Sequence, residues 1–399
     1  THRLGNHAGV GLAMIWNLTS VIHLTQCRQA TRLDRSRKTF GMAEEDSRQT
    51  KGPIINGKIS TESQTQEKDL EGNVCTERTD NGIRQGERTA QRSVLTSYLF
   101  ALRPWSFTAS ITPVALGATL AYKSTGSFDA LIFCTTVFTA LCVHAAGNLV
   151  NTYYDYMRGI DNKKSDDRTL VDKHLSPNDV AWFGGLFYIC GCVGFMVLTL
   201  LSPAKMEHLA LVYFCGLSSS FLYTGGLGLK YVALGDLLIV FTFGPLTVVF
   251  SFLTQAGQLT LFPFLYAIPI ALNTEAILHS NNARDMDTDR HAGIVTLAIL
   301  LGHSGSYALF CALMFVPYII FIMLGLHLTP WMFLPVLSIF VAFRLEKEFR
   351  RKELKSMPQK VAKLNLLMGC LYTVACVVSD SASLPSLSID ITGSTHARV

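Results

Sequence analysis

The sequence has few charged residues for its length. Asp, Glu, Lys and Arg make up 16% of its 399 residues, whereas 49% are hydrophobic. A soluble domain carries about 25% charged residues, so the composition excludes a chain that folds wholly in water. The ten cysteines include no CxxC pair and mostly lie in apolar runs. We therefore expect an integral membrane protein without a disulfide framework or a zinc site.

The N-terminal part lacks the apolar runs of the rest. Residues 1–95 are mostly polar and Gly-rich, which predicts a disordered region. Residues 1–33 contain no acidic residue, a feature of transit peptides. Met42 is a plausible initiator, and part of this region would then lie upstream of the natural start. We expect a transmembrane domain at 96–380 and a disordered polar tail at 381–399.

Apolar runs of the length needed to cross a bilayer begin after residue 96. Since about 20 apolar residues span the hydrocarbon core, we predict an all-α membrane protein with about nine transmembrane helices. The expected spans are 104–122, 131–153, 179–201, 207–223, 231–252, 262–281, 304–325, 329–344 and 362–379.

Basic residues are distributed unevenly between these spans. The loops after spans two, four, six and eight share a side with the N-terminus and hold Arg158, Lys163, Lys164, Arg168, Lys173, Lys230, Arg284, Arg290, Lys347, Arg350, Arg351, Lys352, Lys355 and Lys360. The opposite loops hold only Lys123 and Lys205. The positive-inside rule therefore places the charged loops in the cytosol.

Span six ends in a stretch rich in carboxylates, residues 279–290. On a helix, Asn281, Asp285 and Asp289 lie at i, i+4 and i+8 and form one stripe, with Asn282 beside it. Carboxylates at the mouth of a membrane helix need compensation, and a bound divalent cation is the natural candidate. A solvated loop after a membrane span is the alternative.

Span two ends in a second cluster of this kind. Asn151 and Asp155 lie on one helical face, and Asp161 follows a glycine. Because the spans alternate in direction, both clusters emerge on the same side of the membrane and can face each other across one cavity. Mg²⁺ uses one or two protein carboxylates and completes its shell with water and phosphate oxygens. The paired clusters therefore favour a magnesium site.

Basic residues border the same face, namely Arg103, Arg168, Lys230 and Arg284. They are suited to neutralising a diphosphate, although ordinary membrane topology also accounts for them. Lys230 is the sole charge in the glycine-rich connector 223–231. Together these features suggest a lipid diphosphate whose tail lies among the helices and whose head meets metal at the rim.

These residues resemble the UbiA superfamily of intramembrane prenyltransferases. That family carries two Asp-rich motifs, NDxxDxxxD and DxxxD, each at the end of a membrane helix. Asn282, Asp285 and Asp289 fit the second motif fully. The resemblance covers about residues 97–378 and implies helices arranged around a central cavity.

The first motif departs from the family pattern. It matches at Asn151 and Asp155, but Thr152 replaces the Asp that should follow Asn, and the next acid is Asp161. The number of carboxylates that contact metal in this cluster therefore stays open.

Further stretches resemble the menaquinone-forming branch of the family. They are residues 102–106, 166–172, 223–226 and 275–298. The branch implies transfer of a geranylgeranyl group from geranylgeranyl diphosphate to menadiol or a related quinol, which forms menaquinone-4, or vitamin K2. It also implies endoplasmic reticulum and Golgi membranes, with mitochondria as the alternative, and a partnership with HMG-CoA reductase. Membrane lipid is an expected partner and nucleic acid is not.

With this resemblance we predict roles for individual residues. The expected Mg²⁺ ligands are Asn151, Asp155, Asp161, Asn282, Asp285 and Asp289. The expected diphosphate-binding residues are Arg103, Arg168, Lys230, Arg284, Asn151 and Asn282. The expected catalytic residues are Asp155, Asp161, Asp167 and Lys230, with Asp161, Asp167 or the diphosphate as the acceptor of the ring proton. The candidate aromatic residues that line the site of the prenyl chain and the ring are Phe107, Tyr153, Tyr154, Phe221 and Tyr223. The alternative for each of them is ordinary packing between membrane helices.

Three other functions are compatible with parts of the pattern. A cation-coupled transporter would carry acids near mid-span, whereas here they gather at span ends. A 4-hydroxybenzoate polyprenyltransferase of ubiquinone synthesis and a sterol- or isoprenoid-responsive membrane adaptor stay open. Soluble prenyl synthases also pair Asp motifs, but the apolar spans exclude them.

Overall fold

The computed structural model describes residues 98–99, 101–160, 170 and 175–384. The predicted disordered region at 1–95 lies outside the described residues. Of the predicted tail, the structure describes 381–384, which include the short turn η5 (Ser381–Ser383).

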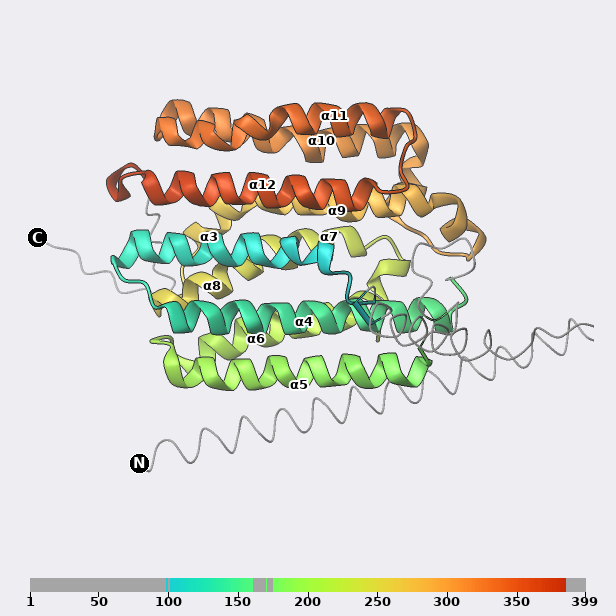
Figure 1. Cartoon of the computed structure of the whole chain (residues 1–399), viewed down its shortest axis with the longest axis horizontal. Helices are drawn as coiled ribbons and strands as arrows, with labels where there is room; N and C mark the ends of the chain where they lie inside the picture. Colours follow the sequence, from blue (N-terminus) through green and yellow to red (C-terminus); the bar gives the residue numbers. More distant parts are fainter. Residues whose placement is uncertain (1–97, 100, 161–169, 171–174, 385–399) are drawn as a thin grey trace, which may run out of the picture.

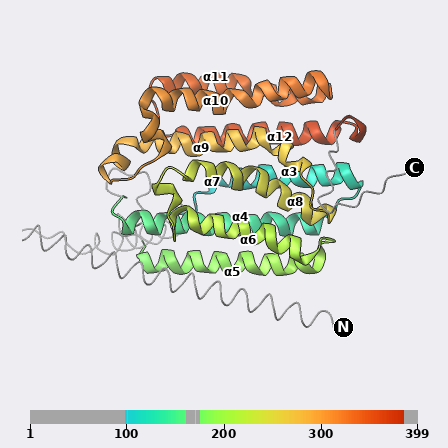
Figure 2. The ribbon, with the colours of Figure 1, turned by 180° about the vertical axis from the view of Figure 1, so that it is seen from behind.

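The described residues form a bundle of long helices that run side by side in alternating directions (Figures 1 and 2). The long helices are α3 (Thr108–Thr125), α4 (Ala130–Met157), α5 (Pro177–Leu201), α6 (Met206–Thr224), α9 (Phe262–His291), α10 (Leu297–His327) and α12 (Met357–Val378). Shorter ones are α7 (Gly235–Phe241), α8 (Thr247–Ala256) and α11 (Ile339–Arg350). The remaining helical turns are η1 (Pro104–Phe107), η2 (Leu229–Tyr231), η3 (Thr242–Leu246) and η4 (Pro330–Ser338).

This architecture confirms the predicted all-α membrane fold. Within the described residues, each of the nine expected spans corresponds to one helical segment, if α7–η3–α8 and η4–α11 each count as one. By length and composition alone, five of these described segments can cross a membrane, namely α4, α5, α7–α8, α10 and α12.

Several helices are longer than their predicted spans, among them the two that carry the Asp-rich stretches. We expected a span at 262–281 followed by a loop, but α9 continues as a helix to His291. Helix α4 likewise extends from the expected residue 153 to Met157. Asn151 and Asp155 therefore lie on α4 and residues 279–290 on α9, and the alternative of a solvated loop for residues 279–290 is wrong.

Local sequence signals set where several helices begin. The Asp129 side chain accepts hydrogen bonds from the backbone N–H groups of Leu131 and Ile132 at the start of α4. Ser176 and Asp179 form a reciprocal capping box at the start of α5, with Pro177 in the first turn. These contacts satisfy backbone donors that have no partner inside the helix.

Helices α7 and α8 are joined by a π-helical turn, η3, rather than by a straight helix. Pro245 lies in this turn and removes one backbone donor, which is a common cause of such distortions. Gly244 lies against α9, where an added Cβ would approach the Cβ of Ala271 to 2.3 Å. The turn therefore brings the backbone of the joined helix close to α9.

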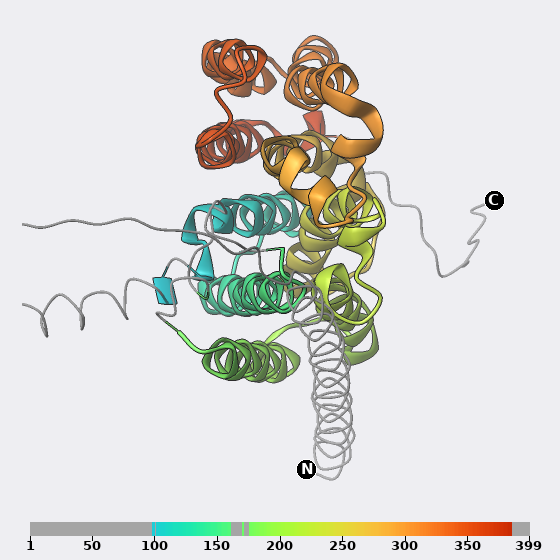
Figure 3. The same ribbon diagram turned by 90° about the vertical axis from the view of Figure 1, so that its right-hand side faces the viewer.

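Seen end-on, the helices form two rows (Figure 3). One row contains α5, α4, α3, α12 and α11, and the other contains α6, α7–α8, α9 and α10. Two hydrophobic clusters hold the rows together, one among α3, α8, α9, α10 and α12, and one among α4, α5, α6 and α8. The C-terminal ends of α4 and α9 lie at the same end of the bundle (Figure 1).

Candidate active site

A cavity of about 190 Å³ lies between α3, α4, α6, α7–α8 and α9. At the end of the bundle that holds the Asp-rich stretches, its lining is polar and includes Arg103, Asn148, Asn151, Lys230 and Asn281. Farther in, its lining is mostly apolar and includes Val212, Leu217, Leu238, Leu246 and Phe250. The cavity therefore joins a charged mouth to an apolar interior, which suits a molecule with a polar head and a hydrocarbon tail.

Asp155 and Asn151 are held by the connector between α6 and α7. The Lys230 Nζ lies 2.6 Å from Asp155 Oδ2 and 3.0 Å from Asn151 Oδ1. The Tyr231 Oη donates to Asp155 Oδ1 at 2.9 Å, and the Thr224 Oγ1 donates to Asn151 Oδ1 at 3.1 Å. Both oxygens of the buried Asp155 carboxylate are therefore bonded, one of them by a cation.

The same connector reaches the turn after α9. The backbone N–H of Val295 donates to the Tyr231 carbonyl oxygen at 3.3 Å, as part of a parallel bridge between Val232 and Val295. Ile160, Tyr231 and Ile294 form a small buried cluster beside it. The connector therefore ties the end of α4 to the end of α9, and the two predicted motifs are brought to one mouth.

In the second motif, Arg284 makes a bidentate pair with Asp285. Its Nε and Nη2 lie 2.8 Å and 2.7 Å from the two carboxylate oxygens, and its Nη2 also donates to Asn281 Oδ1 at 2.9 Å. This fork geometry is the strong form of an ion pair. Arg284 thus neutralises one carboxylate of the motif and orients Asn281, which lines the cavity.

Asp289 is buried one turn farther along α9, beyond the predicted span. Burial raises the pKa of its carboxyl to about 6, the Lys230 ammonium opposes this rise, and the Asp285 and Asp155 carboxylates add to it. Charged residues of both motifs thus lie close enough to Asp289 to influence its pKa. The pKa of Asp289 is therefore raised mainly because the carboxyl is buried, and the neighbouring charges of both signs modify this rise.

A site made of carboxylate and amide oxygens suits a hard cation such as Mg²⁺. Among the described residues, no group of three or more His, Cys, Asp or Glu side chains is close enough to hold a metal ion alone. Mg²⁺ does not need such a cage, because it takes one or two carboxylates and fills its shell with water and substrate phosphate oxygens. The donors present therefore fit this ion when it arrives with a phosphate-bearing molecule.

The remaining predicted site residues do not all line the cavity. Arg103 lines the mouth and has a left-handed φ of +50° directly before Pro104. Such backbone strain is often found at functional sites. Asn282 is buried on α9 but is not part of the cavity lining. Asp161, Asp167 and Arg168 lie outside the described residues.

Of the five aromatic residues that we predicted as walls, Tyr223 lines the cavity. Tyr154 is buried against Tyr153 in the packing of α4, and Phe221 lies against the glycines that follow α6. Phe107 packs on the His144 ring, which itself lines the cavity. The substrate contacts of these residues stay predictions.

Several residues of the site were not among our predictions. Tyr231 directly follows Lys230, so its position in the glycine-rich connector was a usable signal, but its bond to Asp155 depends on tertiary packing. A buried cluster of Asp236, Glu275 and His279 lies beside the cavity wall, with the His279 Nδ1 3.9 Å from Asp236 Oδ1. Glu275 is the one acid in the predicted span 262–281, which is the signal that the sequence offered.

Comparison with known proteins agrees with this geometry. Residues 110–369 match the family model described as the UbiA prenyltransferase family. The chain is 54% identical over 324 residues to UbiA prenyltransferase domain-containing protein 1 of Homo sapiens, covering 80% of this chain and 94% of that protein. It is 57% identical to the protein of the same name from Danio rerio over 296 residues, 74% of this chain and 88% of that protein.

Solved structures show the same fold at low sequence identity. The apo structure of a UbiA homolog from Aeropyrum pernix K1 matches with a TM-score of 0.55 and 19% identity, over 68% of this chain and 98% of that one. A UbiA homolog from Archaeoglobus fulgidus, bound to GPP and Mg²⁺, matches with a TM-score of 0.50 and 13% identity, over 70% of this chain and 99% of that one. The family match and these near-full-length relatives show that the chain belongs to the UbiA prenyltransferase family.

Proposed function

We propose that this prenyltransferase moves a geranylgeranyl group from geranylgeranyl diphosphate to menadiol or a related quinol and so forms menaquinone-4 in its reduced, quinol form. The observation that carries the proposal is the charged mouth, where Lys230 bonds Asn151 and Asp155 beside the Asp285 and Asp289 stripe, at the entrance to an apolar cavity. The structural relative bound to GPP and Mg²⁺ supports a prenyl diphosphate as donor. The choice of acceptor rests on the sequence stretches typical of the menaquinone branch.

The cations of the mouth bind the diphosphate in this proposal. Lys230 and Arg103 line the cavity, so their positive charges lie where phosphate oxygens would bind. Arg284 holds Asp285 and Asn281 in place on the opposite helix. Lys230 would then contact both a carboxylate of the protein and the diphosphate, which fixes the head group relative to α4.

Asn151, Asp155, Asp285 and Asp289 would hold Mg²⁺ in this proposal, with Asn282 and Asp161 as further candidates. When bound, the ion supplies Lewis-acid withdrawal of charge from the diphosphate. The acids come from two different helices that the connector joins. The donor can therefore be held only where the ends of α4 and α9 meet.

In this reaction the protein supplies positive charge for the diphosphate, positions the two substrates and excludes water. The allylic C1–O bond breaks and diphosphate leaves with the bonding pair. A ring carbon of the quinol bonds to C1, and its proton passes to the released diphosphate, with Asp161 and Asp167 as the alternative acceptors. Lys230 and Arg103 stabilise the leaving diphosphate. Apolar residues such as Leu246 and Phe250 exclude water from the allylic cation, and the face of Tyr223 is suited to stabilising it.

Substitution of the two acids on the α9 stripe, Asp285 and Asp289, tests the site. We expect Asp285→Ala and Asp289→Ala each to lower Mg²⁺-dependent geranylgeranyl transfer by at least about 100-fold, because metal polarisation is worth several kcal/mol and about 1.4 kcal/mol is tenfold. Asp287 lies exposed on the same helix, off the stripe, so Asp287→Ala should keep normal transfer. Product mass is measured with purified, inserted protein. Unchanged turnover in either stripe variant would remove that residue from the site.

The acceptor is tested by offering menadiol and 4-hydroxybenzoate in parallel. A product with menadiol alone supports the proposal, and a product with 4-hydroxybenzoate alone assigns the chain to the ubiquinone type. Activity with neither would favour a sterol- or isoprenoid-responsive membrane adaptor.

From the same resemblance we propose that residues 96–380 are the catalytic domain, in endoplasmic reticulum and Golgi membranes, and that HMG-CoA reductase is a partner.

A further inference from the structure

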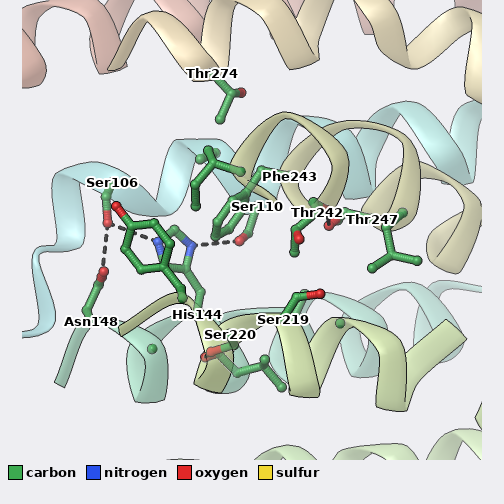
Figure 4. A pocket seen from close by; sticks show the side chains of 18 of the residues that line it. Ser106, Ser110, His144, Asn148, Ser219, Ser220, Thr242, Phe243, Thr247 and Thr274 are labelled. Atoms are coloured by element: carbon green, nitrogen blue, oxygen red, sulfur yellow. Dashed lines mark hydrogen bonds between the residues drawn. The ribbon is translucent and has the colours of Figure 1, made fainter. Parts of the chain in front are cut away.

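A polar cluster lines the cavity from Asn148, at the charged mouth, inward (Figure 4). Its centre is His144, which is buried in α4 and packs between the rings of Phe107 and Phe243, with ring centroids 5.3 Å and 4.7 Å away. Ser106, Ser110 and Asn148 surround it. Polar groups at this depth of a membrane protein are costly unless they are bonded and are often functional.

The hydrogen bonds of this cluster have one consistent direction. The Ser106 Oγ donates its only proton to the Arg103 carbonyl oxygen at 2.8 Å, so it must accept from its other partners. These partners are Asn148 Nδ2 at 3.1 Å and His144 Nε2 at 3.1 Å. His144 therefore carries its proton on Nε2, and its Nδ1 accepts the proton of the Ser110 hydroxyl at 2.7 Å.

This direction leaves Ser110 with unused acceptor capacity. Its single proton is directed to His144, and within the described part of the chain its Oγ makes no other hydrogen bond. A hydroxyl oxygen has two lone pairs, and Ser110 lines the cavity. The cavity therefore presents a hydrogen-bond acceptor that a hydroxyl group can use and a hydrocarbon chain cannot.

Two other hydroxyls of the cavity wall bond to the backbone of their own helical segment instead. Ser219 donates to the Cys215 carbonyl oxygen one turn earlier, and Thr247 donates to the Thr242 carbonyl oxygen. Such bonds to a preceding turn are ordinary for Ser and Thr in membrane helices. Ser110 differs because its proton is directed to a buried imidazole from another helix.

The cluster is also placed correctly relative to the mouth. His144, Asn148 and Asn151 lie at i, i+4 and i+7 on one face of α4, and all three line the cavity. With a rise of 1.5 Å per residue, Ser110's partner His144 lies about 10 Å along the helix axis from Asn151. A ring bound between them would have one edge at Ser110 and the other toward the diphosphate residues.

We propose that Ser110, oriented by His144, accepts a hydrogen bond from a hydroxyl group of the aromatic acceptor and so places its reacting carbon toward the charged mouth. The inference rests on the proposed transfer to a hydroxylated ring and adds the residues that recognise that ring. Ser110 contacts the acceptor, whereas His144 is a positioning residue that acts through Ser110. The hydrogen bond to Ser110 also increases electron density in the ring at the moment of attack.

The experiment compares Michaelis constants for the two substrates. We expect Ser110→Ala and His144→Phe each to raise the KM for the quinol about tenfold, the equivalent of one hydrogen bond, with the KM for geranylgeranyl diphosphate unchanged. The double variant should be no worse than either single variant, because the two residues act as a unit. Ser219→Ala, which removes a cavity hydroxyl bonded to its own helix, is the matched control and should keep both constants.

A second readout uses the acceptor itself. Wild-type protein should use one of the two monomethyl ethers of the quinol about tenfold less well than the free quinol, and Ser110→Ala should make no such distinction. The inference would be overturned if Ser110→Ala changed the KM for both substrates equally, or if its KM for the quinol matched that of Ser219→Ala. Transfer by the wild-type protein would still uphold the proposed function in either case. Wild-type protein that prenylates no hydroxylated ring would overturn both.

Discussion

At the scale of single residues, the mouth of the cavity depends on how Asp155 is held. One oxygen of its carboxylate accepts a hydrogen bond from the Lys230 ammonium, and the other accepts one from the Tyr231 hydroxyl. Arg158 stacks on the same Tyr231 ring at 4.0 Å. Tyr231 is thus fixed on both sides, and we expect it to set the orientation that Asp155 presents to a metal and a diphosphate.

Removing one hydroxyl tests this role. We expect Tyr231→Phe to lower the free energy of unfolding by about 1.5–3 kcal/mol, the range for a hydrogen bond to a charged group, and to lower the transfer rate as well. Tyr307→Phe is the matched control, because the Tyr307 hydroxyl also donates to a carboxylate, that of Glu346 at 2.5 Å, but outside the cavity. Thermal unfolding in detergent and initial rates are measured on both. A loss of rate in both variants alike would contradict a specific role for Tyr231.

At the scale of elements, close packing of α3 on α8 brings two walls of the cavity together. Gly117 lies at the crossing, where an added Cβ would approach the Val248 carbonyl oxygen to 2.3 Å and the Ser251 Cβ to 2.8 Å. Ser251 donates to the Val114 carbonyl oxygen at 2.6 Å across the same contact. Small residues at such crossings let membrane helices approach closely.

The crossing predicts different effects for two glycines. We expect Gly117→Ala to destabilise the protein by about 1–3 kcal/mol, the usual range for overpacking. Gly185→Ala on α5 should be neutral or stabilise by up to about 1 kcal/mol, because nothing lies within 4 Å of its added Cβ and Ala is the better helix former. Thermal unfolding of both variants in the same detergent measures the difference. Equal stabilities would show that α3 and α8 separate without cost.

At the scale of the whole molecule, the alternating helices place the C-terminal ends of α4 and α9, which carry the acids of the charged mouth, at one end of the bundle (Figures 1 and 2). The positive-inside rule predicts that this end faces the cytosol. We expect the variant Asp287→Cys to react with a membrane-impermeant maleimide in sealed vesicles whose cytosolic face is outward. Ser127→Cys, exposed in the loop between α3 and α4, should react only after permeabilisation.

The parent protein gives the background labelling of the native cysteines, and added label is measured by mass. Reaction of both variants in sealed vesicles would contradict the alternation of the helices. The reverse pattern would place the charged mouth on the opposite side of the membrane.

Much of the fold could be read from local pattern. Runs of about 20 apolar residues form helices in a bilayer, because no water is there to bond the backbone. The helices observed at the expected spans confirm this. Helix ends were less accurate. The predicted span ended at residue 281, before Asp285 and Asp289, because charged residues mark the end of an apolar run. Charged residues can nevertheless continue a helix into the aqueous region, as α9 does to His291.

The chain alone determined that this is a helical membrane protein with two Asp-bearing helix ends on one side, because length, hydropathy and i, i+4 spacing are local properties. The tertiary structure decided which groups bond those acids. Lys230 and Tyr231 reach Asp155 from 75 and 76 residues away, and Ser110 reaches His144 across 34. Such contacts depend on how helices pack, since packing brings together side chains whose separation along the chain carries no signal.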